Sequence, residues 1–338
     1  MRKKIIVTIY FKFLNITKGM SYLKNLFENV SFKLKHRLVN FYKERCLKME
    51  NNGRKCYVVA EIGCNHLGNI DIAKRMIEIT ANYCKVDAVK FQKRCIRELL
   101  SEEQYNAPHP HPKNAYGETY GKHREALEFS LEQHKELMEY CKKNHVVYSA
   151  SVWDLTSAKE IASLQPEYIK IPSASNLNFK MLQWLCENYL GEIHLSLGMT
   201  TLSEEERIVE LFIDLHRNKD LVLYACTSGY PVPYSDACIL EIKRLKYKYG
   251  GIVKKIGYSG HHIGISLDGA IAALEPDIIE RHFTLNNDWK GTDHKASLLP
   301  EQMKELVINL ELISQSLKYK EKEILPIEEV QRIKLKNI

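Results

Sequence analysis

The stretch YVVAEIGCNHLGNIDIAKRMIEITANYCKVDAVKF, residues 57–91, decides which fold the sequence predicts. It contains a short apolar run at 57–60, a segment with the 3.6-residue spacing of a helix at 70–84, and a second apolar run at 88–91. A strand, a helix and a further strand in this order are typical of a parallel sheet, whose strands need a crossover connection between them.

The same alternation continues along the chain. Apolar runs predict further strands at 146–149, 168–171, 193–197, 221–225, 256–258 and 278–279, and helical spacing is found at 131–144, 203–216 and 266–276. Eight strands alternating with helices predict an α/β fold of the (β/α)8 TIM-barrel type. The segment 93–128 is too long for a simple crossover, and long excursions of this kind usually serve as lids or binding loops.

The charge distribution divides the chain into two parts. The formal net charge of +7 arises in the first 50 residues, which hold twelve Lys and Arg against three Glu, whereas the remainder holds 37 Lys and Arg against 39 Asp and Glu. We therefore predict a basic N-terminal extension over residues 1–52, which need not belong to the fold, and a barrel domain over 53–338. A nearly neutral domain offers no basic surface for nucleic acid.

The cysteines and the apolar runs indicate the compartment. The nine cysteines are scattered, odd in number and contain no C-x-x-C, which favours reduced thiols in the cytoplasm over a disulfide framework or a zinc site. The longest apolar run of the extension, residues 5–11, is too short to span a bilayer and lacks a signal-peptide cleavage site. A cytoplasmic protein without membrane partners is expected.

Polar side chains cluster where the predicted strands end. Since a barrel gathers the carboxyl ends of its strands on one rim, we expect these side chains to share one site. Two lysines and several hydroxyl groups converging there suit a dianion, most naturally a phosphate ester. The residues in question are Glu61, Lys90, Gln92, Lys170, Ser173, Ser196, Thr227, Ser228, Ser259, His261, Glu280 and His282.

Two histidines suggest a metal site on the same rim. His261 and His282 follow consecutive predicted strands, and two imidazoles beside a carboxylate from Glu61, Glu280 or Asp293 are typical of a divalent-metal site with open positions. The alternative is that either histidine is a hydrogen-bonded structural residue.

Nine motifs resemble the sialic acid synthase family, the phosphoenolpyruvate-dependent synthases of nonulosonic acids. They follow one another in order over about residues 56–315 and two of them, IGYSGHHIG and KGTDHKASL, are similar to the eukaryotic-type branch. The motifs are VVAEIGCNHLGNIDIAKRMI (58–77), DAVKFQK (87–93), AYGETYGKHREALEFS (115–130), YIKIPSASNLN (168–178), LSLGMTT (195–201), ACTSGYPVPYSD (225–236), IGYSGHHIG (256–264), IIERHFT (278–284) and KGTDHKASL (290–298).

The resemblance implies a role for each candidate. His261 and His282 match the ligands of a divalent metal, with Mn²⁺ expected and Mg²⁺ or Co²⁺ as alternatives. Because adjacent side chains of an extended segment point to opposite faces, His262 would then point away. The groups that bind phosphoenolpyruvate match Lys90, Lys170, Ser173, Ser196, Ser228 and Ser259. The positions that approach the sugar or the metal-bound water match Gln92, Tyr230 and Asp293. The carboxylate expected to transfer protons near the metal matches Glu61.

The sequence departs from the family pattern at two points. Ser175 stands where relatives commonly carry an acidic residue that contacts the sugar, and a hydroxyl can bind a sugar but cannot act as a base at neutral pH. The sequence also stops near the point at which a C-terminal antifreeze-like domain would begin. The family precedent is a homodimer in which that domain contributes to the partner's site.

The implied reaction joins phosphoenolpyruvate to the open-chain aldehyde of N-acetylmannosamine or a related N-acylated amino sugar, and releases phosphate. A sialic acid 9-phosphate synthase or a legionaminic-type synthase remains an alternative, since Ser175 leaves the sugar open. A barrel that condenses phosphoenolpyruvate with a phosphorylated aldose matches the motifs less well. The last alternative is a non-catalytic sugar-binding barrel.

Overall fold

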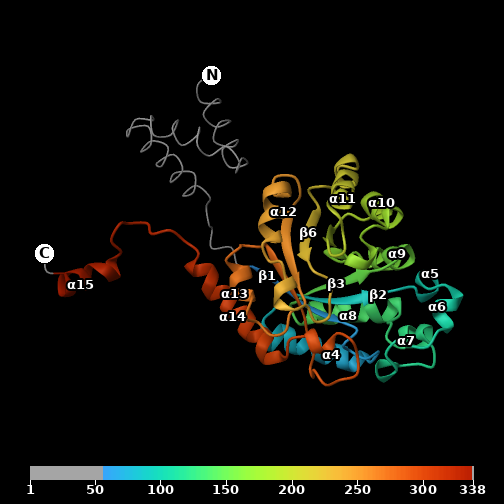
Figure 1. Cartoon of the computed structure of the whole chain (residues 1–338). Coiled ribbons are helices and arrows are strands. Elements are labelled where there is room, and N and C mark those ends of the chain that lie inside the picture. Colours follow the sequence, from blue (N-terminus) through green and yellow to red (C-terminus); the bar gives the residue numbers. More distant parts are fainter. Residues whose placement is uncertain (1–55, 337–338) are drawn as a thin grey trace. The chain divides into compact units, whose positions relative to one another are not determined.

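The computed structural model describes residues 56–336 and contains a closed barrel of eight parallel strands (Figure 1). The strands pair in sequence order, and β1 closes the ring by pairing with β8. This confirms the predicted TIM barrel. The strands are β1 Tyr57–Gly63, β2 Ala88–Lys93, β3 Val147–Val152, β4 Tyr168–Ile171, β5 Glu192–Ser196, β6 Leu221–Cys226, β7 Lys255–Gly260 and β8 Ile278–His282.

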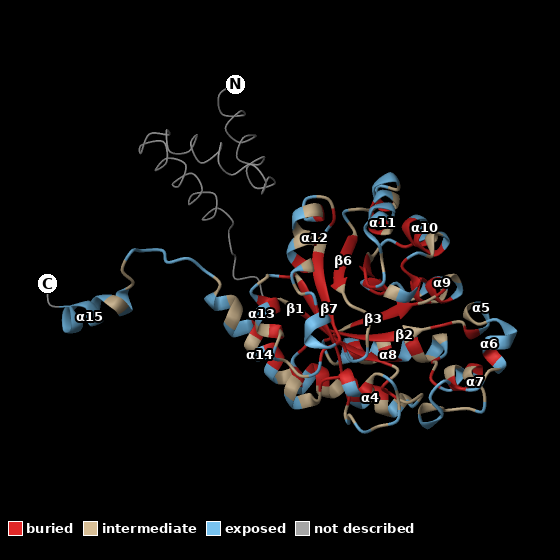
Figure 2. Ribbon diagram, viewed as in Figure 1, coloured by how far each residue is buried: buried red, intermediate tan, exposed pale blue. Residues whose placement is uncertain are grey.

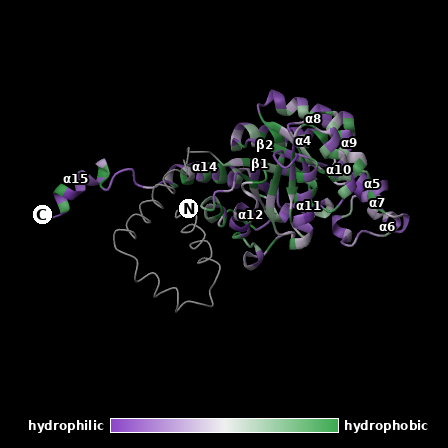
Figure 3. Cartoon of the chain, turned by 90° about the horizontal axis from the view of Figure 1, so that it is seen from above, coloured by the Kyte–Doolittle hydropathy of each residue, from purple (hydrophilic) through white to green (hydrophobic). Residues whose placement is uncertain are grey.

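Helices cover the outside of the barrel and bury one face each against the strands (Figure 2). They are α4 Ile70–Glu78, α8 Leu131–Lys143, α9 Leu155–Ser163, α10 Phe179–Asn188, α11 Leu202–Asp214, α12 Glu241–Tyr249, α13 Asp268–Ala272 and α14 Pro300–Ser316. Figure 3 shows the apolar strands surrounded by helices that are hydrophilic on their outer faces.

Two of the predicted helices begin at capping boxes. The Ser130 hydroxyl accepts from the backbone of Gln133, whose side chain accepts from the backbone of Ser130, so α8 begins at Leu131 as predicted. Thr201 and Glu204 form the same arrangement at the start of α11. The predicted helix over 266–276 is shorter than expected, because α13 ends at Ala272, shortly before the positive φ of 55° at Glu275 and before Pro276.

The strands extend further than the apolar runs predicted. β3, β7 and β8 continue to Val152, Gly260 and His282, so several polar residues expected after the strands are the last residues within them. The apolar pattern stops early because the inward positions change from apolar to charged along each strand. Tyr168, Val222 and Ile278 belong to an inner apolar cluster, and Lys170 and Glu280 lie two residues beyond Tyr168 and Ile278, on the same side of their strands.

The floor of the barrel is a stack of buried rings. The His194 ring stacks on the Tyr168 ring with centroids 4.0 Å apart, and His194 Nδ1 lies 2.8 Å from the Tyr224 hydroxyl. Lys170 Nζ in turn lies 3.8 Å from the centroid of the Tyr224 ring. The charged end of the barrel therefore rests on an aromatic layer.

The excursion after β2 forms three short helices, α5 Ile96–Leu99, α6 Glu102–Asn106 and α7 Tyr120–Glu125. The compact barrel unit ends at Leu317, and residues 318–336 lie outside it and carry α15, Pro326–Leu335. The predicted N-terminal extension, residues 1–52, lies outside the described residues. Within residues 56–336, no helix has both the length and the apolar character that crossing a membrane requires.

Candidate active site

A cavity of about 380 Å³ opens where the carboxyl ends of the strands meet. Thirteen of the fifteen candidate residues named from the sequence line it, and Thr227 and Ser175 do not. The thirteen are Glu61, Lys90, Gln92, Lys170, Ser173, Ser196, Ser228, Tyr230, Ser259, His261, Glu280, His282 and Asp293.

Two buried lysines and two buried carboxylates form the inner end of the cavity. Lys170 Nζ lies 3.0 and 3.1 Å from the two carboxylate oxygens of Glu280. Lys90 forms an ion pair with Glu61, lies 3.7 Å from Glu280 and donates a hydrogen bond of 2.6 Å to the Ser151 hydroxyl. Glu280 thus lies between the two lysines.

The two carboxylates differ in their affinity for protons. Burial raises the pKa of Glu61, and the nearby Glu280 carboxylate adds to this effect, so that the Lys90 ion pair does not restore the ordinary value. Burial would also raise the pKa of Glu280, but the ammonium groups of Lys170 and Lys90 hold it below its ordinary value. A pair of carboxylates with pKa values moved in opposite directions is typical of acid–base sites.

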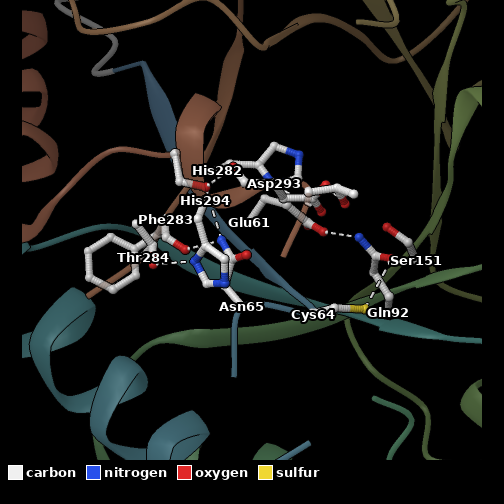
Figure 4. Close-up of polar contacts among 12 residues, drawn as sticks. Glu61, Cys64, Asn65, Gln92, Ser151, His282, Phe283, Thr284, Asp293 and His294 are labelled. Atoms are coloured by element: carbon white, nitrogen blue, oxygen red, sulfur yellow. Dashed lines mark hydrogen bonds and ion pairs between the residues drawn. The ribbon is translucent and has the colours of Figure 1, made fainter. Parts of the chain in front are cut away.

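A polar chain orients the Glu61 carboxylate (Figure 4). Gln92 Nε2 donates to Glu61 Oε1 at 3.0 Å. Arg94 donates to the Gln92 side-chain oxygen. Arg94 NH1 in turn lies 2.8 Å from Glu128 Oε1. Arg94 was not among the residues predicted from the sequence, although its spacing of two residues after Gln92 and four after Lys90 is the same-face spacing of a strand.

The two candidate metal ligands face each other. The ring centroids of His261 and His282 are 5.3 Å apart, and the Tyr230 ring packs against both, at 4.5 and 5.8 Å. His261 Nδ1 lies 3.0 Å from the Thr227 carbonyl oxygen, which can only accept, so Nδ1 carries the proton and Nε2 is left as the basic nitrogen. His282 Nδ1 is buried without a hydrogen-bond partner and lies 4.0 Å from Asp293 Oδ2.

These residues suit a divalent metal ion as part of its coordination shell. Among residues 56–336, no three His, Cys, Asp or Glu side chains are grouped closely enough to hold an ion by themselves. His261 nevertheless has the hydrogen bond from its second nitrogen that ligating imidazoles usually make, and His282 has an unsatisfied nitrogen. Burial lowers the pKa of His282 to about 3, which keeps the neutral form that a metal requires. Water or substrate oxygens would complete the shell.

Hydroxyl groups line the cavity beside Lys170. The backbone N–H of Gly198 donates to the Ser173 hydroxyl at 3.1 Å, and the Ser228 hydroxyl is buried without a partner. A Cβ atom at position 198 would overlap the hydroxyls of both Ser173 and Ser228, so glycine is required there. Ser196 and Ser259 line the same cavity.

Ser175 has a different environment from the other candidates. Its hydroxyl donates to the Trp153 backbone oxygen at 2.7 Å, so it fixes the backbone of a residue that lines the cavity and does not itself line it. Trp153 and Ser151 were not predicted from the sequence, because the predicted third strand ended at residue 149 and both lie beyond it.

The outer wall of the cavity comes from two loops distant in sequence. Tyr116, from the 93–128 excursion, donates its hydroxyl to the Lys290 backbone oxygen at 2.5 Å, and Lys290 Nζ lies 4.6 Å from the Tyr116 ring centroid. Arg124 of α7 lines the same wall. The excursion therefore covers part of the cavity, as expected of a lid or binding loop.

A parallel barrel with its polar cavity at the carboxyl ends of the strands is the arrangement of TIM-barrel enzymes. Within that class, residues 76–322 match the NeuB family, and the chain belongs to this family, that of the sialic acid synthases. The resemblance recognised in the sequence is thereby confirmed.

Relatives and solved structures agree with this assignment. The chain is 35% identical over 273 residues to the N-acetylneuraminate-9-phosphate synthase of Mus musculus, covering 81% of this chain and 74% of the relative. It is 32% identical to the N,N'-diacetyllegionaminic acid synthase of Campylobacter jejuni, covering 78% of each. The crystal structure of the N-acetylneuraminic acid synthetase of Leptospira borgpetersenii in complex with citrate is 27% identical, with a TM-score of 0.70, covering 85% and 94% of the two chains.

Proposed function

We propose that the protein is a nonulosonic acid synthase, which condenses phosphoenolpyruvate with the open-chain aldehyde of N-acetylmannosamine or a related N-acylated amino sugar. The observation that carries the proposal is the convergence of two buried lysines, a group of hydroxyls and a histidine pair in one cavity. The sialic acid and legionaminic acid synthases among its relatives support the same reaction class.

The inner end of the cavity would bind phosphoenolpyruvate. Lys90 and Lys170 supply two buried ammonium groups, and Ser173, Ser196 and Ser228 supply hydroxyl donors in the same cavity. Charge-assisted hydrogen bonds of this kind bind phosphate and carboxylate strongly in a buried site. Holding both ends of phosphoenolpyruvate would fix the face of its double bond toward the sugar aldehyde, and such positioning removes much of the barrier to a reaction between two substrates.

The histidine pair would hold the divalent ion, and Mn²⁺, Mg²⁺ and Co²⁺ are the candidates. An ion held by His261 and His282 would act as a Lewis acid toward the aldehyde oxygen, on which negative charge develops as C3 of phosphoenolpyruvate attacks. Asp293 Oδ2 lies 4.0 Å from His282 Nδ1, within reach of a water molecule bound beside the pair.

Glu61 is the side chain best suited to proton transfer. Its carboxylate lies beside Lys90, is oriented by Gln92, and has a raised pKa. In the reaction, water adds at C2 and phosphate leaves by cleavage of the bond between C2 and the bridging oxygen. Glu61 would accept the proton of that water, and Asp293 is the second candidate for the role.

Phosphate release tests the proposal. Incubation with phosphoenolpyruvate, N-acetylmannosamine and Mn²⁺ is expected to release inorganic phosphate, and EDTA is expected to stop it. The 6-phosphate of N-acetylmannosamine and a 6-deoxy diacetamido sugar are tested in parallel. Absence of metal-dependent release with all three sugars would favour a non-catalytic sugar-binding barrel.

A phosphorylated sugar is a second candidate substrate, and the outer wall of the cavity favours it. Arg124 and Lys290 line this wall, and within residues 56–336 neither forms an ion pair with a carboxylate. By contrast, the inner lysines are paired with Glu61 and Glu280. Two cations without carboxylate partners beside the cavity would suit a second phosphate group, carried by the sugar.

A further inference from the structure

A buried arginine lies on the outer side of the barrel, behind the histidine pair. Glu280 and His282 line the cavity, whereas Arg281, between them on β8, faces away from it and is fully buried. In the segment after β7, His261 lines the cavity and His262 is buried on the other side. Arg281 and His262 are therefore the chain neighbours of the two candidate metal ligands.

The Arg281 guanidinium joins β8 to the turn that follows β7. NH2 donates to the backbone oxygens of His262 and Gly264, at 2.7 and 2.8 Å. NH1 donates to the Asp268 carboxylate at the start of α13 and lies 2.9 Å from His262 Nε2, which is itself 3.2 Å from Asp268 Oδ2. One side chain thus binds two carbonyl groups and a carboxylate, which suits the fork of an arginine.

Gly260, the last residue of β7, leaves room for the Arg281 side chain because it has no side chain of its own. A Cβ atom at position 260 would lie 3.1 Å from Arg281 Cδ and 2.6 Å from the Tyr258 ring. A side chain at position 260 would therefore displace the arginine from the turn that it holds.

The cluster is not arranged for stability alone. Asp268 Oδ1, His262 Nδ1 and Arg281 Nε are all buried without a hydrogen-bond partner. A buried polar group without a partner destabilises the folded state relative to one that is hydrogen-bonded. Buried ion pairs are often replaceable by apolar side chains without loss of stability, so stability alone does not account for this pair.

We propose that Arg281, with Asp268 and His262, is a positioning device that fixes the distance between the His261 and His282 imidazoles. The inference rests on the proposed function, because it assigns these imidazoles to a divalent ion. Arg281 is covalently adjacent to His282, and the carbonyl that it holds belongs to the residue after His261. A change in the guanidinium contacts therefore moves one imidazole relative to the other.

The chain contains a matched control. Arg217 also binds backbone oxygens, those of Cys186 and Gly191 at 2.9 Å each, and lies 2.7 Å from Asp220. These contacts involve the segments that precede β5 and β6, at the end of the barrel opposite the cavity. Arg217→Lys removes a comparable set of contacts and leaves the surroundings of the histidine pair unchanged.

Mn²⁺ binding to the full chain tests the proposal, measured by calorimetry and by the electron paramagnetic resonance spectrum of the bound ion. Arg281→Lys is expected to weaken Mn²⁺ binding by about 10- to 100-fold, the range found for second ligand shells. Arg217→Lys is expected to lower the melting temperature without changing Mn²⁺ affinity. Wild-type affinity and spectrum in a folded Arg281→Lys variant would overturn the proposal.

A second variant keeps the test decisive if Arg281→Lys does not fold. Asp268→Asn retains the size of the side chain and removes its charge, and is expected to weaken Mn²⁺ binding in the same direction. Unchanged affinity in this variant would also overturn the proposal. If the wild-type chain binds Mn²⁺ no better than His261→Ala, the metal site of the proposed function is wrong, and the positioning role is wrong with it. If the wild type binds Mn²⁺ and the Arg281 variant binds it equally well, only the positioning role is wrong.

Discussion

Lys170 and Glu280 face each other inside the barrel, with the lysine Nζ 3.0 and 3.1 Å from the two carboxylate oxygens. Glu280 also lies 3.7 Å from Lys90, so one carboxylate balances two ammonium groups in the proposed phosphate site. We expect phosphoenolpyruvate to bind beside this carboxylate and to take over part of its contact with the lysines.

Removing the charge of Glu280 should make the thermal stability of the ligand-free protein depend on an added anion. Glu280→Gln leaves the ammonium groups of Lys170 and Lys90 short of a counter-charge, and breaking a buried pair in this way costs about 3–5 kcal/mol. We expect a lower melting temperature that millimolar phosphate or phosphoenolpyruvate restores more fully than it stabilises the wild type. Equal stabilisation of both proteins in thermal denaturation would argue against a shared anion site.

Glu61→Gln should separate binding from turnover. The amide keeps the size of the carboxylate but cannot accept a proton, so we expect phosphate release to fall by about 100-fold or more while phosphoenolpyruvate still binds. Glu205→Gln is the control, because Glu205 is also buried and paired, with Arg244 and Lys248, outside the cavity. Undiminished turnover in Glu61→Gln would remove Glu61 from the mechanism.

The neighbouring histidines should respond differently to alanine. His261→Ala removes a candidate ligand and is expected to abolish metal-dependent phosphate release. His262→Ala leaves the backbone oxygen that Arg281 binds and is expected to retain activity within about tenfold, the lower limit for outer-shell changes. Steady-state assays at several Mn²⁺ concentrations compare the two, and the reverse order of effects would exchange the roles of the two residues.

The barrel should lose stability as the pH falls below 6.5. Burial lowers the pKa of His66 and His134 to about 3 and that of His194 to about 4. Below pH 6.5 the unfolded chain binds protons that the folded chain does not, so each histidine lowers the free energy of unfolding by up to about 1.4 kcal/mol per pH unit until its folded pKa is reached. Denaturant titrations from pH 7 to pH 5 measure the slope, which His194→Gln should reduce.

Arg124 and Lys290 on the outer wall predict a preference for a phosphorylated sugar over a neutral one. If the substrate is a 6-phosphate, Arg124→Gln and Lys290→Gln should each lower kcat/KM for the phosphorylated sugar by about tenfold, corresponding to about 1.4 kcal/mol, and leave the neutral sugar unaffected. Lys122→Gln is the control on the same helix, since Lys122 is exposed and pairs with Glu125. Equal losses for both sugars would exclude a phosphate contact.

The sequence was sufficient for the barrel and for the set of strand-end residues that line its cavity. It was insufficient where a residue's role depends on what lies across the barrel. Glu280 is an ordinary polar residue in the sequence, and its place between two lysines exists only because β4 and β8 face each other. Ser175 occupied a position associated with sugar contact, yet its hydroxyl binds the Trp153 backbone, which no local pattern indicates.

The closing pair of strands has a consequence for how the site is assembled. Glu61 on β1 and His282 on β8 are register partners, so a carboxylate from the first strand meets an imidazole from the last only when the ring is complete. The lysines, by contrast, come from β2 and β4. During synthesis almost the whole barrel must therefore leave the ribosome before the proposed metal ligands and proton-transfer group meet. We expect no activity from the growing chain until β8 pairs with β1.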